Sequence, residues 1–450
     1  MLIASLMLLI LAAFAIIAYR LDGGDLVSPR FLLCVALIAS YGLVLLNYNN
    51  WDVHINGKFV LYVSTAVAAW ILGGALVKKL TPKKSSVAIG DKLPLFAANI
   101  RYKYPVNAFM LLSIALTAAY AFKLLSDAGG GSFSERLRAI YDNVVNGYTP
   151  GFIFNQMFEI VIAVAYINTF RLFQRIFSRH DKISIVKLSI PIVMFLIAVL
   201  VTTDRNILLR YAIYFACMYV FFFYENRRFK RMNVAILRRV ALMVIIVVIA
   251  FFVMGLAKQY KSSFLDSISV YGGSGLYNFN LWLESTGGGS AGGASETFGT
   301  FVRVVGDLLG RIGIKLDISY VERFDEFITF TSSTGYVYSS NIYSALKPFV
   351  ADLGYFGAVF FPFLLGMFYQ WLYLRAKRYK YKFSWAVYCM LLYPIVFFPI
   401  LEQLFNRFTL GFVYELVWLA IIYYSVYGRR RYGRIARRAP VKAVQGVKAQ

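Results

Sequence analysis

The stretch VTTDRNILLR, residues 201–210, carries three charges between two long apolar runs. Arg205 and Arg210 suit phosphate chemistry, because a guanidinium keeps its charge in proteins and its donor fork matches phosphate oxygens. Asp204 could orient an arginine, compete with a phosphate for it, act as a general base, or close a tight turn. An arginine at membrane depth costs about 2.5–3.5 kcal/mol. We therefore expect Arg205 and Arg210 to have a partner or an aqueous cavity.

The elements around this stretch are membrane helices. Of the 450 residues, 60% are hydrophobic and only 15% are charged, and the mean hydropathy is +0.63. A membrane-spanning helix needs about 17–25 predominantly apolar residues. Eleven stretches meet or approach this length: 2–19, 31–48, 59–77, 106–122, 151–170, 188–203, 206–224, 240–257, 348–372, 384–401 and 410–427. The sequence therefore predicts an all-α polytopic membrane protein, with residues 1–450 forming a single transmembrane domain.

The distribution of basic residues predicts the orientation. Alternate connections, including the tail at 428–450, hold 33 of the 47 Lys and Arg residues, so that side is expected to be cytoplasmic. The excess positive charge then reflects the orientation of the protein in the membrane and does not indicate a nucleic-acid partner. The basic tail is expected to rest on lipid head groups. The first apolar run lacks a basic leading segment and is interpreted as a retained span.

The outward-facing material includes one large loop at 258–347, between the eighth and ninth spans. Its stretch 271–284 (YGGSGLYNFNLWLE) has aromatic and apolar positions suited to the membrane interface. Residues 285–295 are too rich in Gly and Ser for regular structure. Residues 299–317 predict an amphipathic helix, because charged residues recur every fourth position opposite an apolar face.

Further candidates for chemistry lie on the outer side. Beside Arg205 and Arg210, the arginines expected to bind an anion are Arg136, Arg303, Arg311 and Arg407. Those on the helix at 299–317 could equally form a solvated face. Glu402 shares a short turn with Arg407. It could act as a general base, or it could be the salt-bridge partner of Arg407.

Several other classes of site lack support in the sequence. The two histidines are far apart and there is no cluster of His, Cys and carboxylates with metal spacing, so we expect neither a Ser-His-Asp site nor a metal site. The glycine runs lack the Lys-Ser/Thr of a nucleotide loop. No cofactor is expected. The chain has no similar halves and no matched broken helices, which makes a transporter the weaker interpretation.

The order of these features resembles that of the bacterial oligosaccharide repeat-unit polymerases of the Wzy type. The resemblance rests on Arg205 in TTDRN, on GLYNFNLWLE, and on NIYSAL followed by DLGYFG. The last two contain Asn341, Tyr343 and Asp352, with glycines two and five residues after the aspartate. The resemblance runs loosely over residues 100–410. It departs from the family at Asp204, where a small residue is common.

The resemblance implies a GT-C-like architecture in the inner (plasma) membrane of a bacterium. It implies inverting glycosyl transfer on the outer side, from a growing chain on undecaprenyl pyrophosphate to a lipid-linked repeat unit of an O-antigen or capsule. Arginines would bind the pyrophosphate, with Asn341, Tyr343 and Asp352 in the substrate site. A chain-length regulator is a further candidate partner.

Two alternatives stay open. An O-antigen ligase would use similar arginines, but by resemblance it needs a histidine in the large loop, and residues 258–347 contain none. A transporter or flippase of lipid-linked oligosaccharide is favoured by many charged residues in the spans, and this chain has few.

Overall fold

The structure is a computed structural model, and it describes residues 2–81, 103–145, 148–177, 184–226, 238, 242, 264–289, 295–314, 327–331, 337–378 and 383–427. Within these ranges nine helices are long and apolar enough to cross a membrane. They are α1 (Leu2–Leu21), α2 (Pro29–Leu46), α3 (Gly57–Leu80), α4 (Lys103–Asp127), α6 (Phe152–Phe177), α7 (Ile185–Thr202), α8 (Arg205–Asn226), α12 (Leu346–Arg378) and α15 (Leu410–Tyr427). The chain is therefore a multi-pass helical membrane protein, as its composition predicts.

Two of the eleven expected spans are not among these nine helices. Only residue 242 of the stretch 240–257 is among the described residues, and the basic tail at 428–450 lies outside them. The stretch 384–401 is not one helix: it forms α13 (Phe383–Met390) and the short α14 (Tyr393–Phe397). The break has a local cause, because Pro394 has no N–H to donate to the carbonyl of Met390 and so cannot continue α13.

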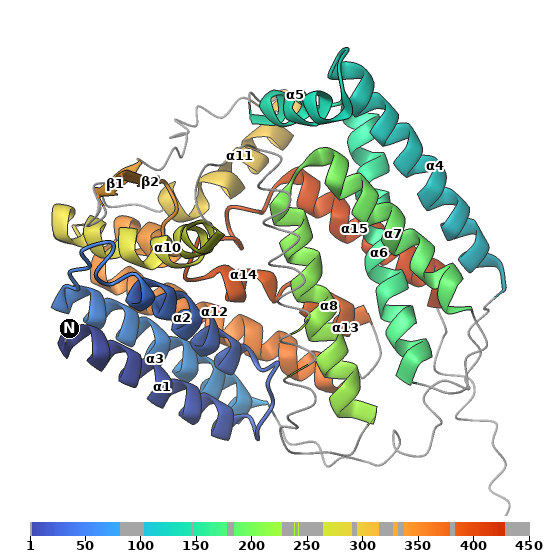
Figure 1. Ribbon diagram of the computed structural model, residues 1–450. Coiled ribbons are helices and arrows are strands. Elements are labelled where there is room, and N and C mark those ends of the chain that lie inside the picture. The colour runs from blue at the N-terminus through green and yellow to red at the C-terminus, as the bar shows by residue number, and fades with distance from the viewer. Residues whose placement is uncertain are drawn as a thin grey trace, which may run out of the picture.

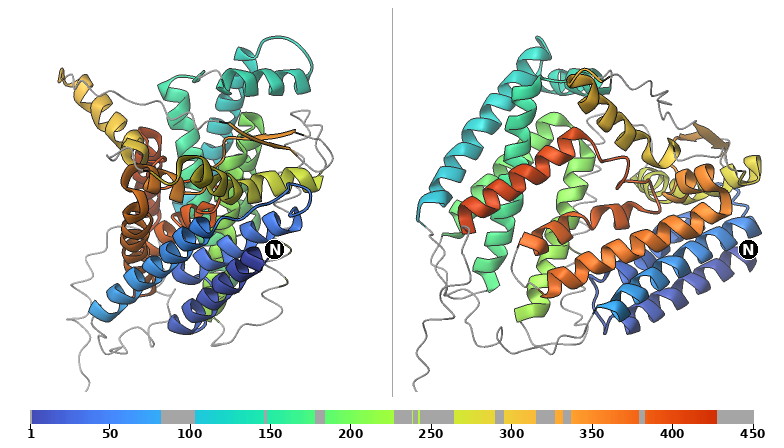
Figure 2. Two further views of the ribbon diagram at one scale, coloured as in Figure 1. Left: turned by 90° about the vertical axis from the view of Figure 1, so that its left-hand side faces the viewer. Right: turned by 180° about the vertical axis from the view of Figure 1, so that it is seen from behind.

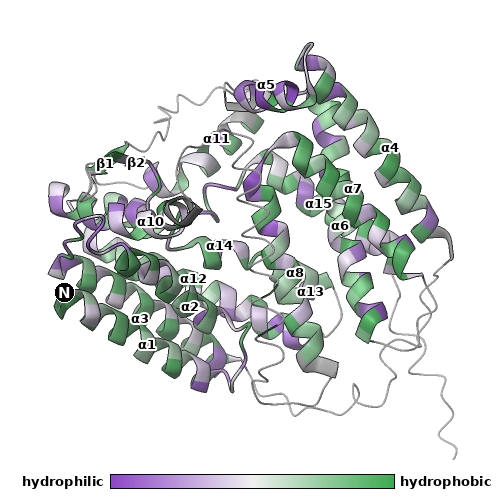
Figure 3. Cartoon of the chain, in the orientation of Figure 1, coloured by the Kyte–Doolittle hydropathy of each residue, from purple (hydrophilic) through white to green (hydrophobic). Residues whose placement is uncertain are grey.

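The helices form two groups with a smaller set between them (Figure 1). One group contains α1, α2, α3 and α12, and the other contains α4, α6, α7 and α15. Helices α8, α13 and α14 lie between the two groups, which Figure 2 shows from two further sides. Apolar residues predominate along the helices of both groups (Figure 3).

Small residues bring α3 and α12 into close contact. A Cβ atom added at Gly366 would lie 2.2 Å from the carbonyl oxygen of Trp70, and one at Gly73 would lie 2.2 Å from that of Phe363. Neither position therefore accepts a side chain without moving the partner backbone. Close approach of backbones through glycine is a common way for membrane helices to associate.

The elements of the loops that are expected to face outward gather at one end of the helices (Figure 1). They are α5 (Phe133–Val145), α10 (Phe264–Thr286), α11 (Ser295–Arg311), β1 (Ile328–Thr331) and β2 (Val337–Ser340). The helix expected at 299–317 is present as α11, which begins four residues earlier and ends at Arg311. The antiparallel hairpin of β1 and β2 was not expected, and it corrects the all-α interpretation of this loop. Its aromatic residues Phe330 and Tyr338 face each other across the strands and contact Trp51.

The stretch 271–284 is covered by protein rather than laid on a membrane interface, which corrects the expectation for this segment. It belongs to α10, where Leu276, Tyr277 and Phe279 are buried. Tyr277 donates a hydrogen bond to the carbonyl of Trp51, and burial, with a smaller contribution from the charge of Asp52, raises the pKa of Tyr277 to about 12. Helix α10 is thus an internal support of the outer end.

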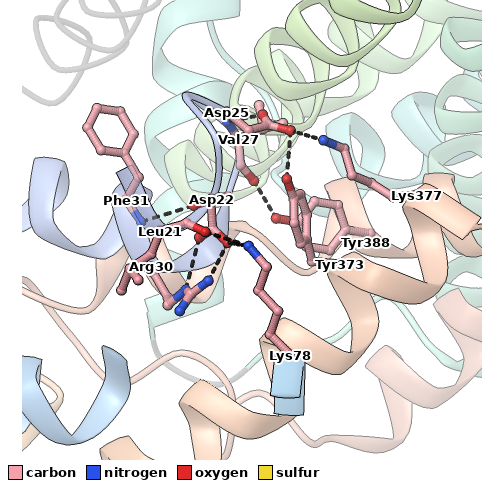
Figure 4. Close-up of polar contacts among 11 residues, drawn as sticks. Leu21, Asp22, Asp25, Val27, Arg30, Phe31, Lys78, Tyr373, Lys377 and Tyr388 are labelled. Atoms are coloured by element: carbon pink, nitrogen blue, oxygen red, sulfur yellow. Dashed lines mark hydrogen bonds and ion pairs between the residues drawn. The ribbon is translucent and has the colours of Figure 1, made fainter. Parts of the chain in front are cut away.

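The opposite end of the first helix group, expected to face the cytoplasm, is held by ion pairs (Figure 4). Arg30 donates to both carboxylate oxygens of Asp22, with its Nε 2.9 Å from Asp22 Oδ2. Asp25 accepts hydrogen bonds from Tyr373, at 2.6 Å, and from Lys377. The Asp22 contacts hold the connection between α1 and α2 to α2, and the Asp25 contacts hold it to α12.

Candidate functional site

Helix α8 begins at a tight turn that Asp204 caps. Thr203 has a φ of 56° and ends α7. The Asp204 Oδ1 atom accepts a hydrogen bond from the Asn206 amide at 2.8 Å and from the Ile207 amide at 3.4 Å. This is the geometry of a helix N-cap, in which a side-chain oxygen satisfies the first free amides. Of the four roles considered for Asp204, the observed bonds match the closing of the turn.

Arg205 and Arg210 point in different directions from α8. Five residues at 3.6 residues per turn place them about 140° apart around the helix. The Arg205 guanidinium lies 5.8 Å from the ring centroid of Tyr271 on α10, whereas Arg210 faces Glu415 on α15. Both side chains are buried. The two arginines of VTTDRNILLR therefore contact different elements.

Arg210 and Arg407 meet at a single carboxylate oxygen. The Nη1 atom of Arg210 and the Nη2 atom of Arg407 each lie 3.3 Å from Glu415 Oε2. Arg407 comes from the connection before α15, and Glu415 is 2% exposed. Arg210 and Glu415 each lie five residues inside their helices, α8 and α15, or about 7.5 Å from the first residues of these helices at 1.5 Å per residue. The cluster is thus near the helix ends that are expected to face outward.

A small pocket opens at this cluster. The break between α13 and α14 supplies one wall, including Tyr393, and α6 supplies Tyr166. Within the described residues, three buried polar atoms here have no hydrogen-bond partner: Arg210 Nε, Glu415 Oε1 and Tyr393 Oη. Irregular backbone at membrane depth is tolerated where it lines a cavity. The pocket therefore offers both donors and acceptors to a polar ligand.

A second carboxylate lies at the same contact between α6 and α15. A Cβ atom added at Gly411 would lie 3.5 Å from Glu159 Oε1, and Gly411 is one turn before Glu415 on the same face of α15. Glu159 Oε2 is buried without a hydrogen-bond partner within the described residues. Two arginines and two glutamates are thus gathered in a largely apolar environment.

Glu402 shapes the connection that carries Arg407. Its Oε1 accepts hydrogen bonds from the amides of Leu404 and Phe405, at 2.6 and 2.8 Å, and its Oε2 accepts one from Asn406 at 2.7 Å. Arg407 extends from this folded connection to Glu415. The observed bonds give Glu402 the role of holding the turn.

Asp352 caps another helix. Its two carboxylate oxygens accept hydrogen bonds from the amides of Glu296, at 2.9 Å, and Thr297, at 2.7 Å, in the first turn of α11. Asp352 is 2% exposed. Gly354, with a φ of 59°, kinks α12 just beyond it, and a side chain at Gly357 would meet the Phe349 carbonyl. The DLGYFG motif thus joins the large loop to the membrane helices.

The segment NIYSAL, residues 341–346, packs against α10. Asn278 Nδ2 donates to the carbonyls of Ser340 and Ile342, at 3.3 and 2.8 Å, on either side of Asn341. Asn341 itself is exposed, whereas Tyr343 is buried. GLYNFNLWLE and NIYSAL, which are distant in sequence, are therefore neighbours in the fold.

The remaining arginine candidates lie on the two outer helices. Arg303 is exposed on α11, and Arg311 is the last residue of that helix. Arg136 is on α5 and donates to the carbonyl of Gly131 at 3.2 Å. None of the three lines the pocket at Glu415.

Four residues of this site were not expected from the sequence: Glu415, Glu159, Tyr166 and Tyr393. A signal for the two glutamates was present, because acidic residues in apolar spans are rare and are usually functional. Within the described residues, no group of three or more His, Cys, Asp or Glu side chains could hold a metal ion. No known protein family, curated protein or solved structure matches the chain.

Proposed function

We propose that this protein is a polysaccharide polymerase, which transfers a growing glycan from a polyprenyl pyrophosphate to a lipid-linked repeat unit at the outer face of the bacterial plasma membrane. The observation that carries the proposal is the convergence of Arg210 and Arg407 on one pocket near the outer ends of the spans. The diphosphate of a lipid-linked sugar occupies this depth, with its sugar outward and its chain in the bilayer.

The chemistry of the site suits such a reaction. In glycosyl transfer from a lipid diphosphate, negative charge develops on the leaving group, and fixed cations that bind it more tightly in the transition state lower the barrier. One such electrostatic contact contributes about 2.7–4 kcal/mol, or about 100- to 1,000-fold in rate. Arg205, buried against α10, is proposed to act on the same anion or on the acceptor substrate.

Substitution of the arginines tests the proposal in cells that make the polysaccharide. Arg407→Ala and Arg205→Ala are expected to leave the protein in the membrane, to abolish long glycan chains and to accumulate single lipid-linked repeats. Lys58→Ala is the matched control, because Lys58 is an exposed cation on the same outer side and away from the pocket. A normal chain-length ladder from Arg407→Ala would remove the pocket from the mechanism.

A transporter of lipid-linked oligosaccharide is the second candidate, because the break between α13 and α14 lines the pocket. Broken helices at a charged site are typical of secondary transporters. The two candidates differ in their need for a sealed membrane: transport requires two compartments, whereas polymerisation proceeds in detergent.

A further inference from the structure

The arginine pair in the pocket already has a resident anion. Glu415 Oε2 accepts from both Arg210 and Arg407 at 3.3 Å, at the atoms that would contact a phosphate oxygen. Its second oxygen, Oε1, has no hydrogen-bond partner within the described residues. An incoming diphosphate must therefore compete with Glu415 for the same two guanidinium groups.

Charge balance determines what happens to Glu415 when it loses this competition. The titratable and charged groups that face it are Arg210 on α8, Arg407 before α15, Glu159 and Tyr166 on α6, and Tyr393 on α14. Within the described residues Glu159 forms no ion pair and its Oε2 has no hydrogen-bond partner, so we count this buried carboxyl group as protonated and neutral. Arg210, Arg407 and the ionised Glu415 then carry a net charge of +1. A diphosphate diester adds two negative charges, which would leave the Glu415 carboxylate without a counterion. Burial of an unpaired charge is strongly unfavourable, and a group in that position takes up a proton instead.

We propose that Glu415 is a displaceable counterion, which gives up Arg210 and Arg407 to the substrate diphosphate and takes up one proton from water as it does so. The proposal rests on the function proposed above. After transfer, loss of that proton returns Glu415 to the arginines and helps to expel the pyrophosphate product. Glu415 would thus keep both arginines paired in the empty site and limit product inhibition.

The proton uptake can be measured on the unaltered protein. The probe is a farnesyl-diphosphate-linked monosaccharide, a diester whose charge is constant between about pH 6.5 and 8.5. Titration calorimetry of the purified protein in detergent, in buffers of different ionisation enthalpy, is expected to show about one proton taken up per probe bound. Its affinity should fall with rising pH, by up to about tenfold per unit.

Two variants identify the group that takes up the proton. Glu415→Gln is expected to bind the probe with an affinity independent of pH, and more tightly than the unaltered protein at about pH 8.5. Glu159→Gln is the matched control, because Glu159 lies at the same helix contact, and it should keep the pH dependence. Loss of the pH dependence in Glu159→Gln but not in Glu415→Gln would overturn the assignment to Glu415.

The outcomes for the two proposals are separate. Binding of the probe without proton uptake, and at the same affinity across the pH range, contradicts the role of Glu415 and leaves the polymerase proposal intact. Failure of the probe to bind at any pH contradicts the diphosphate site itself. Because the calorimetry uses the unaltered protein, neither conclusion depends on the folding of a variant.

Discussion

Replacing Asp352 with Ala removes both carboxylate oxygens from the first turn of α11. Each hydrogen bond to a charged group contributes about 1.5–3 kcal/mol, and loss of an N-cap typically costs about 0.5–2 kcal/mol. Since water can solvate part of the uncapped turn, we expect the opening free energy of α11 to fall by about 2 kcal/mol. This corresponds to about thirtyfold faster amide exchange in that helix.

Hydrogen–deuterium exchange with mass spectrometry checks this value, with peptides from α3 as the internal reference. Asp352→Asn is the matched variant, because it keeps one carbonyl oxygen to accept a hydrogen bond from Glu296 or Thr297. We expect this variant to lower the opening free energy of α11 by about half as much as Asp352→Ala does, so that amide exchange in α11 rises about fivefold. Unchanged exchange in α11 of Asp352→Ala would refute the capping role.

Three further predictions concern the helix contacts and the outer helices. Gly366→Val places a side chain against the Trp70 carbonyl, so we expect overpacking to cost about 1–3 kcal/mol and to lower the thermal unfolding temperature in detergent. Arg30→Ala leaves Asp22 buried without its main partner, at a cost of about 3–5 kcal/mol; replacing both residues with apolar ones should restore much of the unfolding temperature. The backbone amide of Ser132 donates a hydrogen bond to Glu135, which lowers the pKa of Glu135. The capping of α5 by this carboxylate should therefore persist at about pH 4.5 and be lost only at lower pH. Amide exchange in α5, measured as a function of pH, checks this.

The spans were largely predictable because a local run of apolar residues in the sequence indicates a membrane helix. The start of α8 at Arg205 and the end of α7 followed from such runs. The break within 384–401 was not anticipated, although Pro394 marks its position. The hairpin of β1 and β2 was missed because its strands are only four residues long, with a weak alternation.

The site was less predictable because its residues meet only through packing. Glu415 is 205 positions from Arg210, and nothing local to either residue indicates that they pair. Asp204 was a candidate because of its place beside Arg205, and Asp352 because of the family resemblance, yet their observed partners are backbone amides. Residue type identified which side chains could act; the fold determined which of them face a pocket.

The most direct test of the polymerase proposal is glycan synthesis by the purified protein in detergent, supplied only with lipid-linked repeat units. We expect a ladder of longer lipid-linked chains without a sealed membrane, and at least a hundredfold slower elongation by Arg210→Ala. Absence of elongation in detergent, together with movement of the lipid-linked units across vesicles that contain the protein, would contradict the polymerase and favour the transporter.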